Sequence, residues 1–408
     1  MTTAAGEGAV IGEEPTSPAR PPLLLIFTVT VTGILHNTLL QPAIPDILRD
    51  FDASAGTAGV VVAAGTVAGV VAAPVIGVLA DQWGRRAVLV PCLVGFGVFG
   101  GLQALAPNLT WFLVLRFLQG VGGAGLINLA VTLIGDHWDG LARSRAVAHN
   151  AAVLTVSLAV FPPVGGFLTD LGTWRYAVAP YAVGLVTAAL VWTRLPAHRP
   201  ERRPVGTQLR AAAGYARHPA VLSAYAMGFV VFFLIFGLFL TALPIHLEED
   251  FGLDAGARGL VLAVPALSST IAALTLGRLR SRFDVRPLIA AGWACMAVAF
   301  GVIGVAPTLA LLLAGAFVYG IGEGLMIPTL QDVVTGSAPI DHRSSVVALF
   351  VGVARFGQTV GPLTVGVLLA ATTTTLPFVA GAAVALATML MAAGVSGRRN
   401  RRPSTFRP

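Results

Sequence analysis

The sequence predicts an all-α membrane protein of twelve transmembrane helices, arranged as two pseudo-symmetric six-helix bundles. The first observation is composition: mean hydropathy is +0.82, and only 11% of residues are charged, against about 25% in an ordinary soluble domain. The second is a series of long apolar runs, and the third is the placement of the arginines between them. The 47 glycines and 26 prolines lie largely inside apolar runs, where transmembrane helices tolerate them.

A helix needs about 20 apolar residues to cross the hydrocarbon core, and the chain offers twelve such runs. The predicted spans of the first half are 22–44, 58–80, 87–106, 111–135, 146–169 and 177–195. Those of the second half are 219–244, 257–279, 287–306, 308–333, 345–370 and 375–395.

The polar segments between and around these spans divide the chain. An Arg- and Pro-rich break at 196–218 is predicted to be a cytoplasmic linker between an N-terminal bundle, 22–195, and a C-terminal bundle, 219–395. Residues 1–21 lack the basic start and cleavage site of a signal peptide. They are expected to form a disordered cytoplasmic tail, with 396–408 a basic cytoplasmic tail.

The arginines predict the orientation, because basic residues stay in short cytoplasmic loops during insertion. Placing the N-terminus inside puts most of them in cytoplasmic loops, and leaves only Arg49, Arg175 and Arg258 outside. We therefore expect a multi-pass protein of the inner (cytoplasmic) membrane with both termini cytoplasmic. The basic pI reflects this topology, so no nucleic-acid partner is expected. Cys92 and Cys295 lie far apart in apolar runs, so neither a metal site nor a cofactor is predicted.

The two halves repeat each other at a shift of 200 residues. One unbroken register runs through all six spans of each half, which chance matches between Gly-rich segments do not explain. The matching pairs include Gly56 and Gly256, Gly59 and Gly259, Phe117 and Phe317, Pro162 and Pro362, and Gly166 and Gly366. Two homologous bundles related by an axis along the membrane normal would place a substrate path between them.

The loop between the second and third spans reads GVLADQWGRR, from Gly77 to Arg86. A basic loop that only sets topology would explain the arginines but not Asp81. The loop resembles the signature G-x-x-x-D-(R/K)-x-G-R-R of the major facilitator superfamily, and differs from it only at Gln82. The resemblance extends over about 22–395, nearly the whole chain.

This resemblance implies a cytoplasmic gate. In that family the aspartate meets the start of the eleventh helix, here near Ser344 and Ser345, where the helix dipole favours an acid. An acid at the inner end of the fourth helix, here Asp136, joins the arginine of the loop. The expected gate residues are Gly77, Asp81, Gly84, Arg85, Arg86 and Asp136.

The fourth span carries Arg116, Gln119 and Gly120, which resemble the family's second motif, R-x-x-Q-G. In the family this arginine is tied to proton coupling. A charge inside a span is costly and points to function by default. The alternative is an arginine near the outer end whose side chain extends to the interface.

The fifth span carries Pro162, Gly165 and Gly166, which resemble the family's antiporter motif G-P-x-x-G-G, although Phe161 replaces the first glycine. The eleventh span carries the complete Gly-Pro pair of this motif, at Gly361 and Pro362. In the family this motif is common among exporters. Close packing of a kinked helix would account for the same residues.

The remaining polar residues inside or near spans are candidates for proton coupling or the substrate cavity. Glu323 lies ~20 Å along its span at about 1.5 Å per residue, near the midplane, where low dielectric favours the neutral acid. Arg355 is either its partner or a packing charge, and Gln358 lies one turn further on. His36 is either a hydrogen-bonded packing residue or a proton-carrying group. Asp46 is a coupling candidate that alternatively caps a helix or stays solvated.

The sequence thus predicts a secondary transporter that exports a small, fairly apolar compound, such as a drug or secondary metabolite, in exchange for protons. The alternative is a proton-coupled importer on the same fold. A membrane enzyme is disfavoured because motifs such as HExxH or GxSxG are not evident, and a receptor because no large soluble domain is present. The expected partners are a small molecule, protons and the lipid bilayer, with the chain monomeric.

Overall fold

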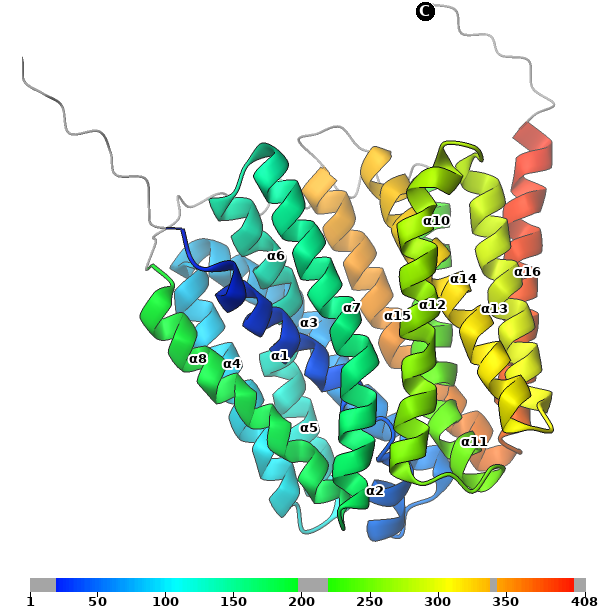
Figure 1. Cartoon of the computed structure of the whole chain (residues 1–408), viewed down its shortest axis with the longest axis horizontal. Helices are drawn as coiled ribbons and strands as arrows, with labels where there is room; N and C mark the ends of the chain where they lie inside the picture. Colours follow the sequence, from blue (N-terminus) through cyan, green and yellow to red (C-terminus); the bar gives the residue numbers. More distant parts are fainter. Residues whose placement is uncertain (1–19, 197–218, 338–342, 400–408) are drawn as a thin grey trace, which may run out of the picture.

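The computed structural model describes residues 20–196, 219–337 and 343–399, and these residues are helical apart from short turns (Figure 1). Within them, 11 helices are long and apolar enough to cross a membrane. A shorter apolar helix, Leu23–Thr38, stands where the first span is predicted. The described residues therefore confirm the all-helical membrane fold. The predicted tails and the linker lie largely outside them.

The first half contains the helices of spans one to six. They are α1 Leu23–Thr38, α2 Ile44–Asp50, η1 Ala55–Thr57, α3 Ala58–Trp83, α4 Arg85–Leu102, η2 Gln103–Leu105, α5 Leu109–Gly123, α6 Leu126–His137, α7 Gly140–Asp170, η3 Trp174–Ala182 and α8 Val183–Arg194. The second half continues with α10 Pro219–Leu234, the π-helix η4 Ile235–Ala242, α11 Leu243–Glu249, α12 Ala255–Arg280, α13 Val285–Val305, α14 Leu309–Gly336, α15 Arg343–Ala371 and α16 Thr375–Arg399.

Two spans that the sequence predicts as continuous are broken. The first stops at Thr38 and resumes at Ile44, beside Pro42 and Pro45, because proline lacks the N–H that a helix interior needs. The fourth breaks between α5 and α6, around Ala124. It breaks there because the flanking glycines favour helix poorly.

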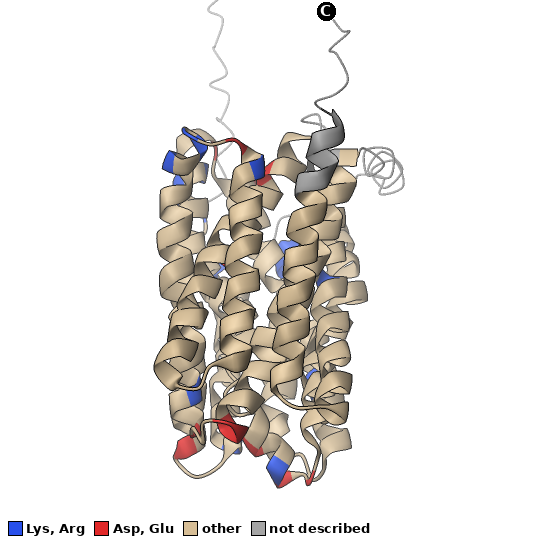
Figure 2. Ribbon diagram, turned by 90° about the vertical axis from the view of Figure 1, so that its right-hand side faces the viewer, with Lys and Arg blue, Asp and Glu red and all other residues tan. Residues whose placement is uncertain are grey.

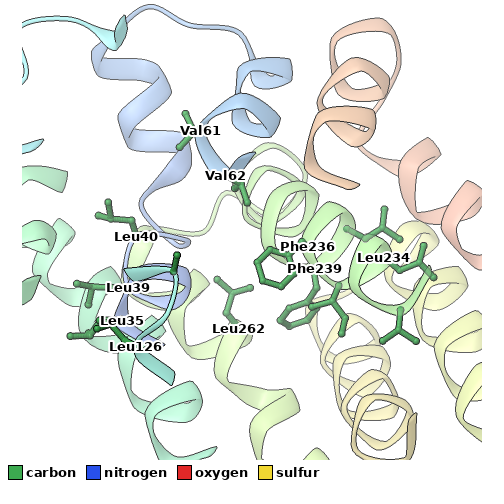
Figure 3. Packing of buried hydrophobic residues seen from close by; sticks show 14 of the residues in the cluster. Leu35, Leu39, Leu40, Val61, Val62, Leu126, Leu234, Phe236, Phe239 and Leu262 are labelled. Carbon is green, nitrogen blue, oxygen red and sulfur yellow. The ribbon is translucent and has the colours of Figure 1, made fainter. Parts of the chain in front are cut away.

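The hydrophobic core is continuous from one half to the other. Figure 3 shows Leu35, Leu39 and Leu126 of the first half and Phe236 and Phe239 of the second among the buried side chains of one cluster. The halves meet where α7 packs on α12 and where α3 packs on α15 (Figure 1).

Charged residues gather at the two ends of the bundle, with few between them (Figure 2). One end, here called the arginine-rich end, carries Arg85, Arg86, Arg143 and Arg280. The opposite end, called the closed end for the contacts described below, carries Asp46, Asp170, Glu248 and Arg258.

Candidate functional site

At the closed end the halves touch backbone to backbone. An added Cβ atom at Gly59 on α3 would lie 2.2 Å from the carbonyl oxygen of Pro362 on α15. The repeat-related contact is nearly the same: a Cβ atom at Gly259 on α12 would lie 2.4 Å from the carbonyl oxygen of Pro162 on α7. The sequence repeat thus marks two crossings between the halves, and glycine is needed at both.

The antiporter-like motif lies in this contact region. A Cβ atom at Gly165 would lie 1.7 Å from the Leu39 carbonyl oxygen, and one at Gly166 would lie 2.1 Å from that of Ala255. On α15, a Cβ atom at Gly361 would lie 2.3 Å from the Phe233 carbonyl oxygen. The motif residues Gly165, Gly166 and Gly361 therefore lie in close helix packing.

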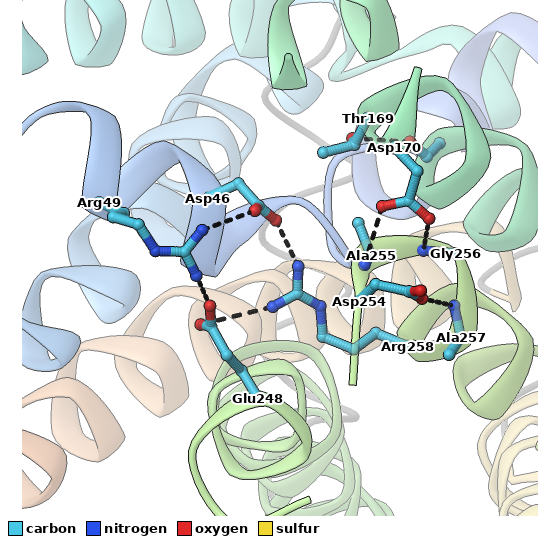
Figure 4. Close-up of polar contacts among 11 residues, drawn as sticks. Asp46, Arg49, Thr169, Asp170, Glu248, Asp254, Ala255, Gly256, Ala257 and Arg258 are labelled. Atoms are coloured by element: carbon cyan, nitrogen blue, oxygen red, sulfur yellow. Dashed lines mark hydrogen bonds and ion pairs between the residues drawn. The ribbon is translucent and has the colours of Figure 1, made fainter. Parts of the chain in front are cut away.

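Four charged side chains bridge the halves next to these crossings (Figure 4). Asp46 on α2 pairs with Arg258 on α12, and Arg49 on α2 pairs with Glu248 on α11. Within the same cluster, Arg49 is 3.1 Å from Asp46, and Arg258 is 3.4 Å from Glu248. The Arg258 side chain is only 1% exposed, so this pairing compensates a buried charge.

Asp46 lies near the outer end of the first span, where the sequence places it. The structure shows neither a helix cap nor a fully solvated acid, but a bridge to the other half. It also lies at the end of the bundle and not in a central cavity, because the chain turns at the break after Thr38 and carries α2 along this end.

A fifth charged side chain, the third acid of the group, also joins the halves at this interface. The Asp170 carboxylate, at the end of α7, accepts hydrogen bonds from the backbone N–H groups of Ala255 (3.2 Å) and Gly256 (2.7 Å), the first residues of α12 (Figure 4). An acid at a helix N-terminus is favoured by the helix dipole. The repeat-related residue is Ala370, whose Cβ atom lies close to Gly56. The acid is thus present at only one of the two crossings.

The repeat also carries matching polar contacts within each half. Asp50 accepts hydrogen bonds from the Trp174 indole and the Arg175 guanidinium. Asp250, 200 positions later, contacts His246 and Thr374. In each half an aspartate at the end of the first span, at the closed end, contacts residues at the start of the sixth span of that half.

At the arginine-rich end the expected contact between Arg85 and Asp136 is present at 3.0 Å, and Arg85 is also 2.5 Å from Asp81. Arg86 packs over the Trp192 ring at 4.4 Å. Gly84 turns the chain between α3 and α4 with a φ of 94°, which glycine adopts without strain.

These gate residues connect elements of the first half alone. The helix that Asp81 was expected to reach, α15, begins at Arg343, but the side chains of Ser344 and Ser345 lie outside the described residues. Near the same end, a Cβ atom at Gly77 or at Gly277 would meet no atom within 4 Å. Close crossings of the kind seen at the closed end are thus not formed at these two glycines.

In the middle of the bundle, Arg116 is only 5% exposed. Its guanidinium donates to the Tyr181 hydroxyl and to the His36 carbonyl, each at 3.2 Å. The alternative of a side chain reaching the interface is therefore wrong. The His36 ring donates from Nε2 to the Gly65 carbonyl at 2.8 Å. Gln119 is also buried and accepts from Gln103 at 2.8 Å.

Arg355 on α15 reaches across to the first half. It donates to the Gln358 side chain at 3.2 Å and to the Ala124 carbonyl at 3.4 Å, at the break in the fourth span. Nearby, the Thr66 hydroxyl donates to the Gln358 carbonyl at 3.2 Å. Arg355 is therefore a contact between the halves. It is not paired with Glu323, because this cross-half reach takes its guanidinium to α5 and α6.

Glu323 lies at the middle of α14, and no hydrogen bond or ion pair to it is found among the described residues. One turn earlier on the same face, Tyr319 stacks on Phe239 with ring centroids 4.5 Å apart, and its buried hydroxyl has no partner in the described structure. A carboxyl group without a cation in this apolar setting is costly in its ionised form, so its neutral form is favoured.

Comparison with known proteins decides the family. The model of the Major Facilitator Superfamily matches residues 26–254 and 225–408. The chain belongs to this superfamily. It is thus a secondary transporter and not an enzyme.

Several similar proteins are named as exporters or resistance proteins. A tetracycline resistance protein, class C, from Escherichia coli is 28% identical over 386 residues, covering 89% of this chain and 94% of that protein. The bacillibactin exporter of Bacillus subtilis is 23% identical, covering 83% of this chain and 88% of that protein.

Solved structures agree on the fold. A bacterial homologue of the human lysosomal transporter Spinster, in an inward-facing and occupied conformation, has a TM-score of 0.73 at 17% identity. The comparison covers 94% of this chain and 98% of that one. The nucleoside transporter NupG has a TM-score of 0.75 at 14% identity, covering 91% and 98%.

The ion pairs at the closed end give a first prediction. We expect a double-mutant cycle with Asp46→Asn and Arg258→Gln to give a coupling energy of about 1–3 kcal/mol, because Arg258 is buried. The matched cycle of Asp46→Asn with Arg49→Gln should give about 0–1 kcal/mol, because the Arg49 side chain is 64% exposed. Unfolding of the purified variants in detergent measures both. Equal coupling energies would contradict this ranking.

Proposed function

We propose that this transporter exports a small, fairly apolar compound in exchange for protons, by alternating access of its two six-helix halves. The observation that supports proton coupling is the position of Glu323, an acid at mid-helix without a cation partner in the described residues. Such a carboxyl group can hold a proton in one conformation and release it when its surroundings change. That exchange would couple proton flow to movement of the halves.

The orientation belongs to the same proposal. The arginine-rich end is cytoplasmic, both termini lie on that side of the inner membrane, and the chain acts as a monomer. The positive-inside bias supports this orientation. The closed end then faces outward, where Asp46, Arg258 and Asp170 join the halves. The conformation described is thus inward-facing, with the unpacked glycines Gly77 and Gly277 toward the cytoplasm.

Export is favoured over import by two observations. Relatives covering most of the chain are named as tetracycline resistance, bacillibactin export and multidrug efflux proteins, and the antiporter-like motif of α7 is largely present. A proton-coupled importer on the same fold is the alternative. The direction of proton movement during transport in membrane vesicles separates the two.

Asp81 gives the second prediction. Asp81→Asn should fold and insert normally, because the Asp81 side chain is 62% exposed, but should transport at roughly a tenth of the wild-type rate or less. The expected reason is the loss of the charge that meets α15 when the arginine-rich end closes. Ethidium and tetracycline efflux from cells lacking other pumps measures this. The control is Asp284→Asn, an exposed acid in the corresponding loop of the second half. Wild-type efflux in the Asp81 variant would show that the loop only sets topology.

Glu323 gives the third prediction. Glu323→Gln keeps the shape of the side chain but cannot titrate, so it should abolish proton-driven accumulation of the dye ethidium in inverted vesicles. Counterflow of the dye, which requires no net proton movement, should persist. Glu249→Gln, an exposed acid at the closed end, is the control and should behave as wild type. Glu323 is not the coupling group if the variant still accumulates dye with an unchanged dependence on pH.

A further inference from the structure

A small cavity lies at the junction of the halves, beside the break in the fourth span. It is lined by His36 and Asn37 of α1, by Ala124 at the break, by Arg355 of α15 and by glycines of α1, α3 and α5. Its free space is about 10 Å³, room for one water-sized group. Because both halves contribute to its wall, its size and lining change when the halves move.

The charge around this cavity is positive and uncompensated. Arg355 contacts only neutral groups, the Gln358 side chain and the Ala124 carbonyl. Arg116 lies directly behind His36 and likewise contacts only a hydroxyl and a carbonyl. In the part of the chain that the structure describes, no carboxylate lies within 4 Å of either guanidinium, since none of the ion pairs includes them. A charge inside a membrane protein normally pairs with an opposite charge.

The break in the fourth span and the His36 ring complete the lining of the cavity, and the arginines supply its positive charge. The break ends α5 at Gly123 and starts α6 at Leu126, so the negative end of one helix dipole and the positive end of the next offset each other beside Ala124. The His36 ring is nine-tenths buried and its Nδ1 atom has no partner. Because Nε2 donates to the Gly65 carbonyl, Nδ1 of the neutral ring can only accept a hydrogen bond, so the contact to an anion comes from arginine and not from His36.

We propose that this cavity is a binding site for a monovalent anion, with Arg355 as the principal contact. The anion is either a free ion of about chloride size or the anionic group of an organic compound whose remainder lies outside the roughly 10 Å³ of free space. An anion would neutralise charge shared by both halves. It would thereby stabilise the conformation in which Arg355 reaches Ala124. This site is separate from Glu323, which makes no ion pair with either arginine in the described residues.

Thermal unfolding of the purified full chain in detergent tests the site. The buffer contains gluconate at constant ionic strength, and the probes are chloride, benzoate and benzamide, the neutral analogue of benzoate. We expect chloride or benzoate, at about ten times its dissociation constant, to raise the midpoint by roughly 2–4 °C. Benzamide should have no effect. Arg355→Gln should abolish the shift, Arg355→Lys should retain part of it, and Arg280→Gln, at the arginine-rich end, should retain all of it.

The outcomes separate the two sources of the anion. If chloride raises the unfolding midpoint and benzoate raises it no further, the site binds a free small ion. If only benzoate raises the midpoint, the site binds an organic anion. The proposal is overturned if benzamide stabilises as well as benzoate, if neither anion stabilises the wild type, or if Arg355→Gln keeps the shift. Anion stabilisation without proton-driven dye export would contradict the proposed function and leave the anion site standing.

Discussion

The structure depends on two places where the backbones of opposite halves touch without an intervening side chain. There is no space for a Cβ atom at Gly59, which lies against the Pro362 carbonyl, or at Gly259, which lies against the Pro162 carbonyl. At this distance dispersion forces between backbones act directly, as in other close helix pairs in membranes. The charged residues of the closed end lie next to these crossings. Asp46 meets Arg258 beside this close approach.

The charges of the interior are distributed unevenly. Arg116 and Arg355 lie near the junction of the halves without an acid, and Glu323 lies on α14 without a cation, within the described residues. If these groups had only a structural role, pairing them would cost less than leaving them apart. Separated charges are suited to mobile partners, namely a proton at Glu323 and an anion at Arg355. A substrate that changes either partner would change the balance between conformations.

Much of the fold could be predicted because apolar composition identifies the membrane spans and the 200-residue repeat identifies the two halves. The repeat also pairs Gly59 with Gly259 from the sequence alone. The closed-end pairs could not be predicted, because residues 212 positions apart, such as Asp46 and Arg258, meet only through tertiary packing. A signal was present: Arg49 and Arg258 are two of the three arginines on the predicted outer side. The break near Ala124 was missed because glycines are also tolerated in continuous spans.

The most direct test of alternating closure is a pair of distances measured by pulsed electron spin resonance. Spin labels at the exposed positions Leu171 and Val305 report on the closed end, and labels at Trp83 and Phe283 on the arginine-rich end. Replacing Gly259 with alanine, which puts a methyl group against the backbone of α7, should lengthen the first distance and shorten the second. If both distances stay unchanged, or change in the same direction, the closed-end crossings do not control access.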